Sequence, residues 1–490
     1  MRNFTFKGLF LAGLFMVLGC LSIQAADDDG LITKQITIKL EKAGTLPDKI
    51  GSTKKFQITN LKIIGEINGT DLRMIREMAG NDAWGDKTNG MLSVLDLSDA
   101  KIVKGGDYYF HPDNYFCYTS NDKIGDYAFY GCSGLTSLTL PSGVTKIGGG
   151  AFFNCSGLTS LTLPSGLTEI GYETFSGCSG LTSLTLPSGL IEIGYDTFSG
   201  CSGLTSLTLP SGVTEIGEGA FYGCKGLTSL TLPSGLTEIG YGAFSGCSGL
   251  TSLTLPSGLT KIGDSAFRGC KGLTSLTLPS DLTYIGNQTF SGCSGLTSLT
   301  LPSGLTKIGN DAFEDCIGLT SLTLPSGVTS IGNYAFSGCR GLTSLTLPSG
   351  LTEIGYGTFS GCSGLTSITL PSGVTEIGAR AFSGCSGLTS IYVYTEKLPK
   401  MGRSVFEDCD AKKCTVYVPK GTYDDYWLSE FGYFENIVEF DPTGINNVIT
   451  SNDAKELSRY SLNGQRLSAP TKGLNIVKYS DGSVKKVVVQ

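Results

Sequence analysis

Hydrophobic and polar positions recur along most of the chain with a fixed period of 23 residues. One unit, residues 135–157, reads LTSLTLPSGVTKIGGGAFFNCSG. Within this unit, Leu138 and Leu140 alternate with Ser137 and Thr139. Such alternation predicts a short strand with one buried face and one face open to solvent.

The rest of each unit predicts turns that bring the chain back to the start of the next unit. Residues 141–143 (Pro-Ser-Gly) end the strand, and Gly148 opens a second turn. Between and after these turns we expect Val144, Ile147 and Phe152 to point inward. A unit of this kind has three sides, and its apolar side chains all face one interior.

The twelve cysteines of the repeats mark the register without a break, because each follows the last by 23 residues. They are Cys132, Cys155, Cys178, Cys201, Cys224, Cys247, Cys270, Cys293, Cys316, Cys339, Cys362 and Cys385. Stacked coils produce this periodicity, whereas a single globular core does not require it. About 13 coils with a ladder spacing of roughly 4.8 Å would form a column about 60 Å long.

The repeated coil, with its LxxLxL strand, IGxxAF segment and cysteine, resembles the BspA-like leucine-rich repeats of bacterial surface proteins. The resemblance covers about residues 120–410. It implies a leucine-rich-repeat solenoid over residues 124–409, with a parallel strand ladder and mostly irregular returns. It also implies a role in adhesion to host matrix proteins and to other cells.

Two flanking regions lack the regular repeat, and we expect them to cap the open ends of the solenoid. Residues 27–123 form the predicted N-terminal cap, with strands over 56–65 and 92–103 and a helix over 71–78. Residues 410–442 form the predicted C-terminal cap, which begins with the strand sequence CTVYVP.

Residues 443–490 predict a small β module, because they contain three strand-like segments with turns at Asn463-Gly464 and Asp481-Gly482. The segments YSLNGQRL, KGLNIVKY and KKVVV resemble the C-terminal sorting domains of type IX secretion cargo. The sequence departs from that pattern at Gln465 and Asn475. A terminal β module without a transport role is the alternative.

The first 26 residues predict a signal peptide, because a positively charged start precedes an apolar run over 9–21. Cleavage is expected near Ala25. A lipoprotein signal with Cys20 as the anchored residue is the alternative interpretation. No other segment is long and apolar enough to span a membrane, so we expect no transmembrane segment in the mature chain. The protein is therefore predicted to be exported, to the cell surface or the medium.

Charge and candidate chemistry argue against nucleic-acid binding and catalysis. The net charge of −7 does not suit a phosphate backbone. With His111 as its only histidine, the chain is predicted to be no enzyme and to need neither metal nor cofactor. The repeat cysteines are expected to be reduced and buried, because equivalent Cβ atoms in stacked coils lie too far apart for disulfides. Cys409 and Cys414 interrupt the register, and a disulfide between them is an open alternative.

Two surfaces are the candidate binding sites. The first is a pair of hydroxyl columns on the strand face, which could equally be ordinary solvated strand residues: Ser137, Thr139, Ser160, Thr162, Ser183, Thr185, Ser206, Thr208 and Thr231. The second is an edge of tyrosines after the Ile-Gly turn, which we expect to be exposed: Tyr172, Tyr195, Tyr241 and Tyr356. Exposed tyrosines suit recognition, although a soluble edge also tolerates them.

These features predict an exported binding protein or adhesin that presents an extended Ser/Thr-rich face to a macromolecular partner. The expected partner is an extracellular protein or glycan, from a host matrix or from other cells. A passive spacer or stalk is the alternative. A spacer would normally carry a separate functional domain at its tip, and no such domain is visible in the sequence.

Overall fold

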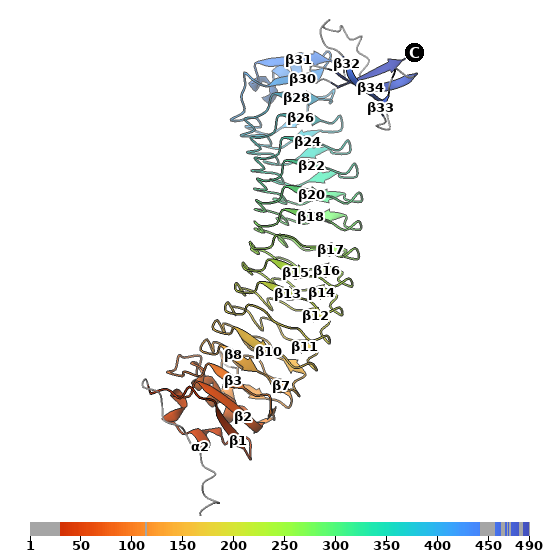
Figure 1. Ribbon diagram of the computed structural model, residues 1–490. Helices are drawn as coiled ribbons and strands as arrows, with labels where there is room; N and C mark the ends of the chain where they lie inside the picture. Colours follow the sequence, from red (N-terminus) through yellow and green to blue (C-terminus); the bar gives the residue numbers. More distant parts are fainter. Residues whose placement is uncertain are drawn as a thin grey trace, which may run out of the picture.

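The computed structural model describes residues 30–112, 115–441, 456–461, 466, 467, 469, 472–479 and 484–489. Figure 1 shows a gently curved column of coils stacked along one axis, with the N-terminal region at one end. The solenoid of stacked coils predicted from the 23-residue period is thus confirmed. The predicted signal peptide, with Cys20, lies outside the described residues. Within the described ranges, no helix is long and apolar enough to cross a membrane.

The N-terminal region combines short strands with the longest helix of the described chain. Its elements are β1 (Ile36–Leu40), α2 (Leu46–Ile50), η1 (Lys54–Phe56), β2 (Asn60–Ile67), α3 (Gly69–Met78), β3 (Val94–Asp96), β4 (Ala100–Ile102), β5 (Gly105–Phe110) and β6 (Cys117–Thr119). The strand expected over 56–65 begins four residues late, because η1 extends to Phe56. The helix expected over 71–78 starts earlier, at a capping box formed by Asn68 and Asp71. The sequence pattern missed β1 and α2.

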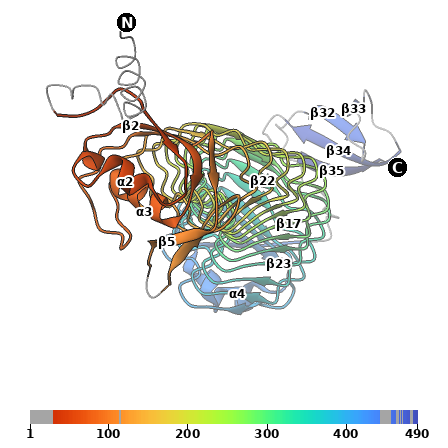
Figure 2. The same cartoon turned by 90° about the horizontal axis from the view of Figure 1, so that it is seen from below.

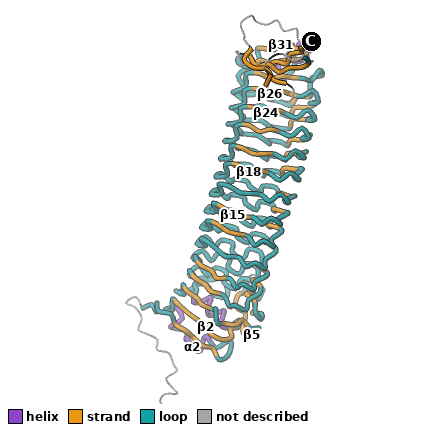
Figure 3. The backbone as a smooth tube through the Cα atoms, turned by 45° about the vertical axis from the view of Figure 1, so that its right-hand side comes forward, coloured by secondary structure: helices purple, strands orange, loops and turns teal. Residues whose placement is uncertain are grey.

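Most regular coils contribute two very short strands, and Figure 3 shows how much of each coil consists of loops and turns. The strands of the first side are β8 (Ser137–Thr139), β10 (Ser160–Thr162), β13 (Ser206–Thr208), β15 (Ser229–Thr231), β18 (Ser275–Thr277), β20 (Ser298–Thr300), β22 (Ser321–Thr323), β24 (Ser344–Thr346), β26 (Ser367–Leu370) and β28 (Ser390–Val393). Those of the second side are β7 (Lys123–Ile124), β9 (Lys146–Ile147), β11 (Glu169–Ile170), β12 (Glu192–Ile193), β14 (Glu215–Ile216), β16 (Glu238–Ile239), β17 (Lys261–Ile262), β19 (Tyr284–Ile285), β21 (Lys307–Ile308), β23 (Ser330–Ile331), β25 (Glu353–Ile354), β27 (Glu376–Ile377) and β29 (Lys400–Met401).

Strands of neighbouring coils pair in parallel and in register, so that Leu138 lies beside Leu161 and Ile147 beside Ile170. The pairing is interrupted on both sides, however. On the first side of the described column, the pairing breaks after β10, β15 and β20, and a new sheet begins with the next strand. On the second side it breaks after β11, β17 and β23. Residues 183–185 and 252–254 form no strand, although Leu184 and Leu253 remain buried. The predicted parallel strand ladder is therefore present, but it is divided into separate segments on both sides.

The continuous element is the third side of the coil, which we call the phenylalanine corner: residues 150–155 and their equivalents 23 residues apart. Here Gly150, Phe152 and Asn154 each donate a backbone hydrogen bond to a carbonyl of the next coil, 22 residues later. The same three bonds recur at every step from Tyr127 to Glu407. Unlike the strand ladders, this column of hydrogen bonds has no gap.

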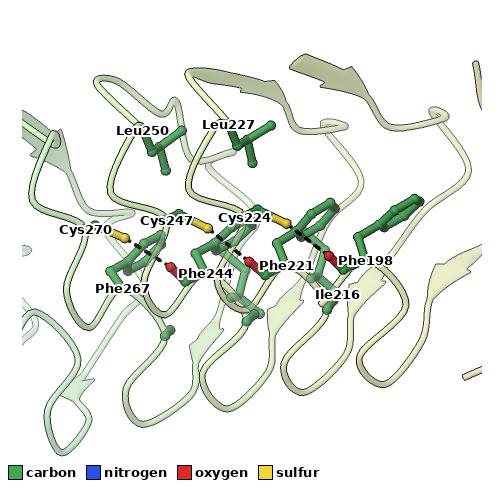
Figure 4. Packing of buried hydrophobic residues seen from close by; sticks show 14 of the residues in the cluster. Phe198, Ile216, Phe221, Cys224, Leu227, Phe244, Cys247, Leu250, Phe267 and Cys270 are labelled. Atoms are coloured by element: carbon green, nitrogen blue, oxygen red, sulfur yellow. Dashed lines mark hydrogen bonds between the residues drawn. The ribbon is translucent and has the colours of Figure 1, made fainter. Parts of the chain in front are cut away.

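Phenylalanine rings and cysteine thiols fill the inside of the phenylalanine corner. From Phe129 to Phe406 the rings stack nearly parallel, with centroids 5.2–5.8 Å apart. Each thiol from Cys155 to Cys385 donates to a phenylalanine carbonyl of the preceding coil, with sulfur–oxygen distances of 3.0–3.2 Å. Figure 4 shows three such bonds in a row, beginning with Cys224 and Phe198. The predicted ladder of buried, unbridged thiols is present, and each of these thiols also has a hydrogen-bond partner.

The N-terminal region covers the first coil and satisfies the carbonyls that would otherwise lack a preceding coil. Arg76 of α3 is fully buried and donates to the carbonyls of Ala128 and Tyr130. The hydroxyl of buried Tyr109 donates to the carbonyl of Asp126 at 2.8 Å. These three carbonyls correspond to those that accept the corner hydrogen bonds in every later coil. Figure 2, viewed along the column, shows α2 and α3 over this end.

At the other end, the described chain continues the first-side sheet with β30 (Thr415–Pro419) and β31 (Asn436–Phe440), joined through α4 (Tyr423–Trp427) and η2 (Glu430–Tyr433). The disulfide considered between Cys409 and Cys414 is not formed. Both thiols are free and buried, and Cys409 extends the thiol ladder by donating to Phe382.

The described tail strands are β32 (Glu456–Ser461), β33 (Arg466–Leu467), β34 (Gly473–Tyr479) and β35 (Val484–Val489), which form one antiparallel sheet. Asn475 is buried there and accepts a hydrogen bond from Arg459. The predicted Asn-Gly and Asp-Gly turns lie outside the described residues. A sorting role for this segment stays a prediction.

The buried thiols make the fold sensitive to alkali. Burial raises the pKa of Cys224, Cys293 and Cys362 from 9.0 to about 12. Above pH 9 the unfolded thiols lose their protons while the folded ones keep them, so unfolding is favoured as the pH rises. This contribution to stability is complete below pH 9 and is lost between pH 9 and about 12. Each thiol lowers the free energy of unfolding by about 1.4 kcal/mol per pH unit in that window.

Cys224→Ala should therefore make the fall in unfolding free energy between pH 9 and 11 shallower by about 1.4 kcal/mol per pH unit. Denaturant titrations followed by circular dichroism at several pH values measure this slope. Ser229→Ala, at an exposed strand position of the next coil, is the control and should leave the slope unchanged. Equal slopes for Cys224→Ala and the parent protein would contradict the account.

Candidate functional site

The strand side carries the predicted hydroxyl columns, which we call the hydroxyl face. Most of its predicted residues are exposed, because alternate strand positions point away from the buried leucines: Ser160, Thr162, Ser183, Thr185, Ser206, Thr208 and Thr231. Ser137 and Thr139 are only half-buried rather than fully open. They pair with Val94 and Asp96 of β3, which border them with larger side chains.

A further threonine column, which the sequence analysis did not single out, lies one residue before each strand. Thr205 and Thr228 represent it: each donates its hydroxyl to the backbone carbonyl of the equivalent threonine 23 residues earlier, at 3.2 and 3.1 Å. The same bond recurs in most coils. These hydroxyls are therefore occupied by holding coils together. The invariant threonine of the LTSLT segment was the available signal.

The hydroxyls of the hydroxyl face differ from those of this threonine column, because among the described residues they are not bonded to a neighbouring coil. Within the described part of the chain, no hydrogen bond ties the side chains of Ser206, Thr208 or Thr231 to the protein. The first-side strands from β10 to β24 carry only serine, leucine and threonine, so this surface has no charge. It offers repeated donors and acceptors that are free to meet an extended partner.

The tyrosine edge is exposed in part. Tyr172, Tyr195 and Tyr241 expose 49%, 47% and 55% of their surface. Tyr356 was expected to be exposed and is not: it is half-buried against Tyr334, with ring centroids 5.0 Å apart. Tyr334 lies 22 residues before Tyr356, so the two tyrosines are not at equivalent positions of the repeat. The 23-residue period therefore did not reveal their contact.

Tyr222 is an exposed aromatic residue that the sequence analysis missed, with 55% of its surface open. It follows the corner Phe221, at a position that is serine in most coils, and this departure from the repeat was the available signal. Charged residues on the second side form ion pairs between coils: Lys146 with Glu169, Lys261 with Glu238, and Lys400 with Glu376.

The single histidine lies in an aromatic cluster at the N-terminal end. The His111 ring is 4.7 Å from that of Trp84 and 4.1 Å from that of Phe116, between ring centroids. This placement matches a surface histidine packed against neighbouring rings.

Comparison with known proteins agrees with this geometry. A family model described as "BspA type Leucine rich repeat region (6 copies)" matches residues 122–247, 214–326 and 306–424, which together cover more than half of the chain. The chain belongs to the BspA-type leucine-rich repeat family. No curated protein matches this BspA-type chain.

Solved structures of other leucine-rich repeat proteins are similar to this BspA-type protein. A leucine-rich repeat protein from Bacteroides ovatus is 33% identical, over 67% of this chain and 90% of that chain, with a TM-score of 0.57. A leucine rich cell surface protein from Faecalibacterium prausnitzii is 29% identical, over 68% of this chain and 86% of that chain, with a TM-score of 0.44.

Two threonines of one coil, one bonded to the preceding coil and one on the hydroxyl face, should differ in their contribution to stability. Thr228→Val removes a hydroxyl that donates to a backbone carbonyl, and we expect a loss of about 1 kcal/mol. Thr231→Val, three residues later on the hydroxyl face, should change stability by less than about 0.5 kcal/mol. Denaturant titration of both variants checks this difference. Equal losses would show that the threonine column before the strands does not hold the coils together.

Proposed function

We propose that this BspA-type protein is exported and binds an extended macromolecular partner along its hydroxyl face. The observation that carries the proposal is the uniform, uncharged array of exposed hydroxyls over successive coils. A uniform array does not define one pocket for a small ligand. It suits a partner that makes many weak contacts along about 60 Å, whose sum gives useful affinity.

Export is supported by the signal-like residues 1–26 and by the sorting-like segment at the C-terminus. Leucine-rich-repeat solenoids typically serve as non-enzymatic binding proteins. We propose an adhesin role towards extracellular proteins or glycans, with sorting through residues 443–490 as part of the same proposal.

A quadruple variant tests the hydroxyl face. Replacing Thr162, Thr185, Thr208 and Thr231 together by lysine should abolish most binding, because four long charged side chains would interrupt the neutral array. The probes are immobilised fibronectin, collagen, laminin and hyaluronan, with binding measured by surface plasmon resonance. Each probe that binds the parent protein should bind the variant at least about tenfold more weakly, which corresponds to 1.4 kcal/mol.

The matched control adds the same charge to the same coils elsewhere. Ser165, Ser188, Ser211 and Ser234 are exposed in the Pro-Ser-Gly turns, and their replacement by lysine should leave binding nearly unchanged. Circular dichroism should show both variants folded. The proposal would be contradicted if the parent protein bound none of the four probes. Equal binding by the parent protein and the Thr→Lys variant would also contradict it.

A further inference from the structure

A hollow opens on the tyrosine edge between consecutive coils, away from the hydroxyl face. We call it the tyrosine hollow, and its aromatic walls are Tyr195, Tyr222 and Tyr241. Its volume of about 330 Å³ is at the lower end of the range for ligand pockets. This size suits one inserted side chain rather than a folded domain.

Glycines form part of the lining of the tyrosine hollow. Gly219 and Gly242 have φ angles of 60° and 56°, and each holds a left-handed position two residues after the Ile-Gly pair. Non-glycine residues occupy this position in other coils, such as Glu173 and Ser265, with φ angles of 51° and 58°. Gly242 leaves out a side chain at this edge, whereas the place beside Gly219 is filled by the carboxyl group of Asp196.

Elsewhere on the same edge, an aromatic ring of the protein covers the equivalent glycine. A Cβ atom on Gly150 would stand 2.6 Å from the ring of Tyr127, and one on Gly357 would stand 2.5 Å from the ring of Tyr334. At Gly242 the nearest atom to such a Cβ is 3.9 Å away and belongs to Ser245. The chain thus fills two of these places with its own planar groups and leaves this one open.

Charge identifies the kind of group that fits the open place. Asp196 and Glu218 also line the tyrosine hollow. The sequence from 147 to 224 contains no lysine or arginine. The same stretch contains six acidic residues: Glu169, Glu173, Glu192, Asp196, Glu215 and Glu218. Burial raises the pKa of the Asp196 carboxyl, so a cation beside this partly desolvated group would stabilise its charged form.

We propose that the tyrosine hollow receives an arginine side chain of a partner protein. A guanidinium group is planar, stacks on aromatic faces and carries five donors in a fork that matches carboxylates. The tyrosine walls, the open glycine and the two carboxylates meet these properties together. Lysine carries the same charge but cannot stack as a plane. This site is separate from the hydroxyl face and does not depend on the function proposed for it.

The test uses a fluorescent Arg-Gly repeat peptide with three arginines, and matched peptides with lysine or citrulline in their place. In fluorescence polarisation with the full chain, the arginine peptide should bind at least about fivefold more tightly than the lysine peptide or the citrulline peptide. Its affinity should fall as the salt concentration rises. Equal affinity for the lysine peptide, or no binding of the arginine peptide at millimolar protein, would overturn the proposal.

Two variants test whether the arginine peptide binds in the tyrosine hollow. Each installs a residue that already occurs at the equivalent position of other coils. Tyr222→Ser installs the residue found at the equivalent Ser199 and Ser245, and Glu218→Tyr installs the residue found at the equivalent Tyr195 and Tyr241. Each should weaken binding of the arginine peptide at least about fivefold while the chain stays folded.

Tyr334→Ala, in the filled place beside Tyr356, is the control and should bind the arginine peptide as the parent protein does. Unchanged binding in Tyr222→Ser, or an equal loss in Tyr334→Ala, would place the peptide elsewhere and overturn the proposal.

Discussion

Contact between one coil and the next depends on the phenylalanine corner. Three backbone hydrogen bonds, one ring stack and one thiol bond join there at each regular step. A carbonyl such as that of Phe198 accepts both the amide of Cys201 and the thiol of Cys224. The strand sides need no unbroken ladder, because the corner already fixes the spacing and rotation of the coils. Their outward side chains can therefore vary without loss of the fold.

The same constraint explains the N-terminal region and the surface chemistry. A column of directional hydrogen bonds must end, and unsatisfied carbonyls at its first coil would be costly. Arg76 and Tyr109 replace the missing coil by donating to those carbonyls. Behind this cap, the position after the Ile-Gly turn holds residues as different as Tyr195, Glu218 and Asn310. One scaffold thus carries a uniform hydroxyl face beside an edge that differs from coil to coil.

The sequence was sufficient to predict the solenoid, its inward residues and its free thiols, because each follows from the period and from apolar spacing. It could not predict the interrupted ladders, since Ser183 and Ser206 lie in identical LTSLTLP segments yet only the second is in a strand. From the sequence alone, Arg76 is expected to be a surface residue of a helix, because its burial depends on contact with the first coil. The tyrosine hollow depends likewise on which coils are neighbours, and the residue pattern alone does not show that a glycine is left uncovered.

Native-state hydrogen exchange tests most directly whether the phenylalanine corner is the continuous element. Two coils lack first-side strands at 183–185 and 252–254, yet keep the corner bonds from Phe198 and Phe267. The account predicts slow exchange for both corner amides, equal to that of Phe221, and exchange more than about tenfold faster at the two interrupted strand segments. Fast exchange at Phe198 and Phe267, with protection confined to the paired strands, would contradict it.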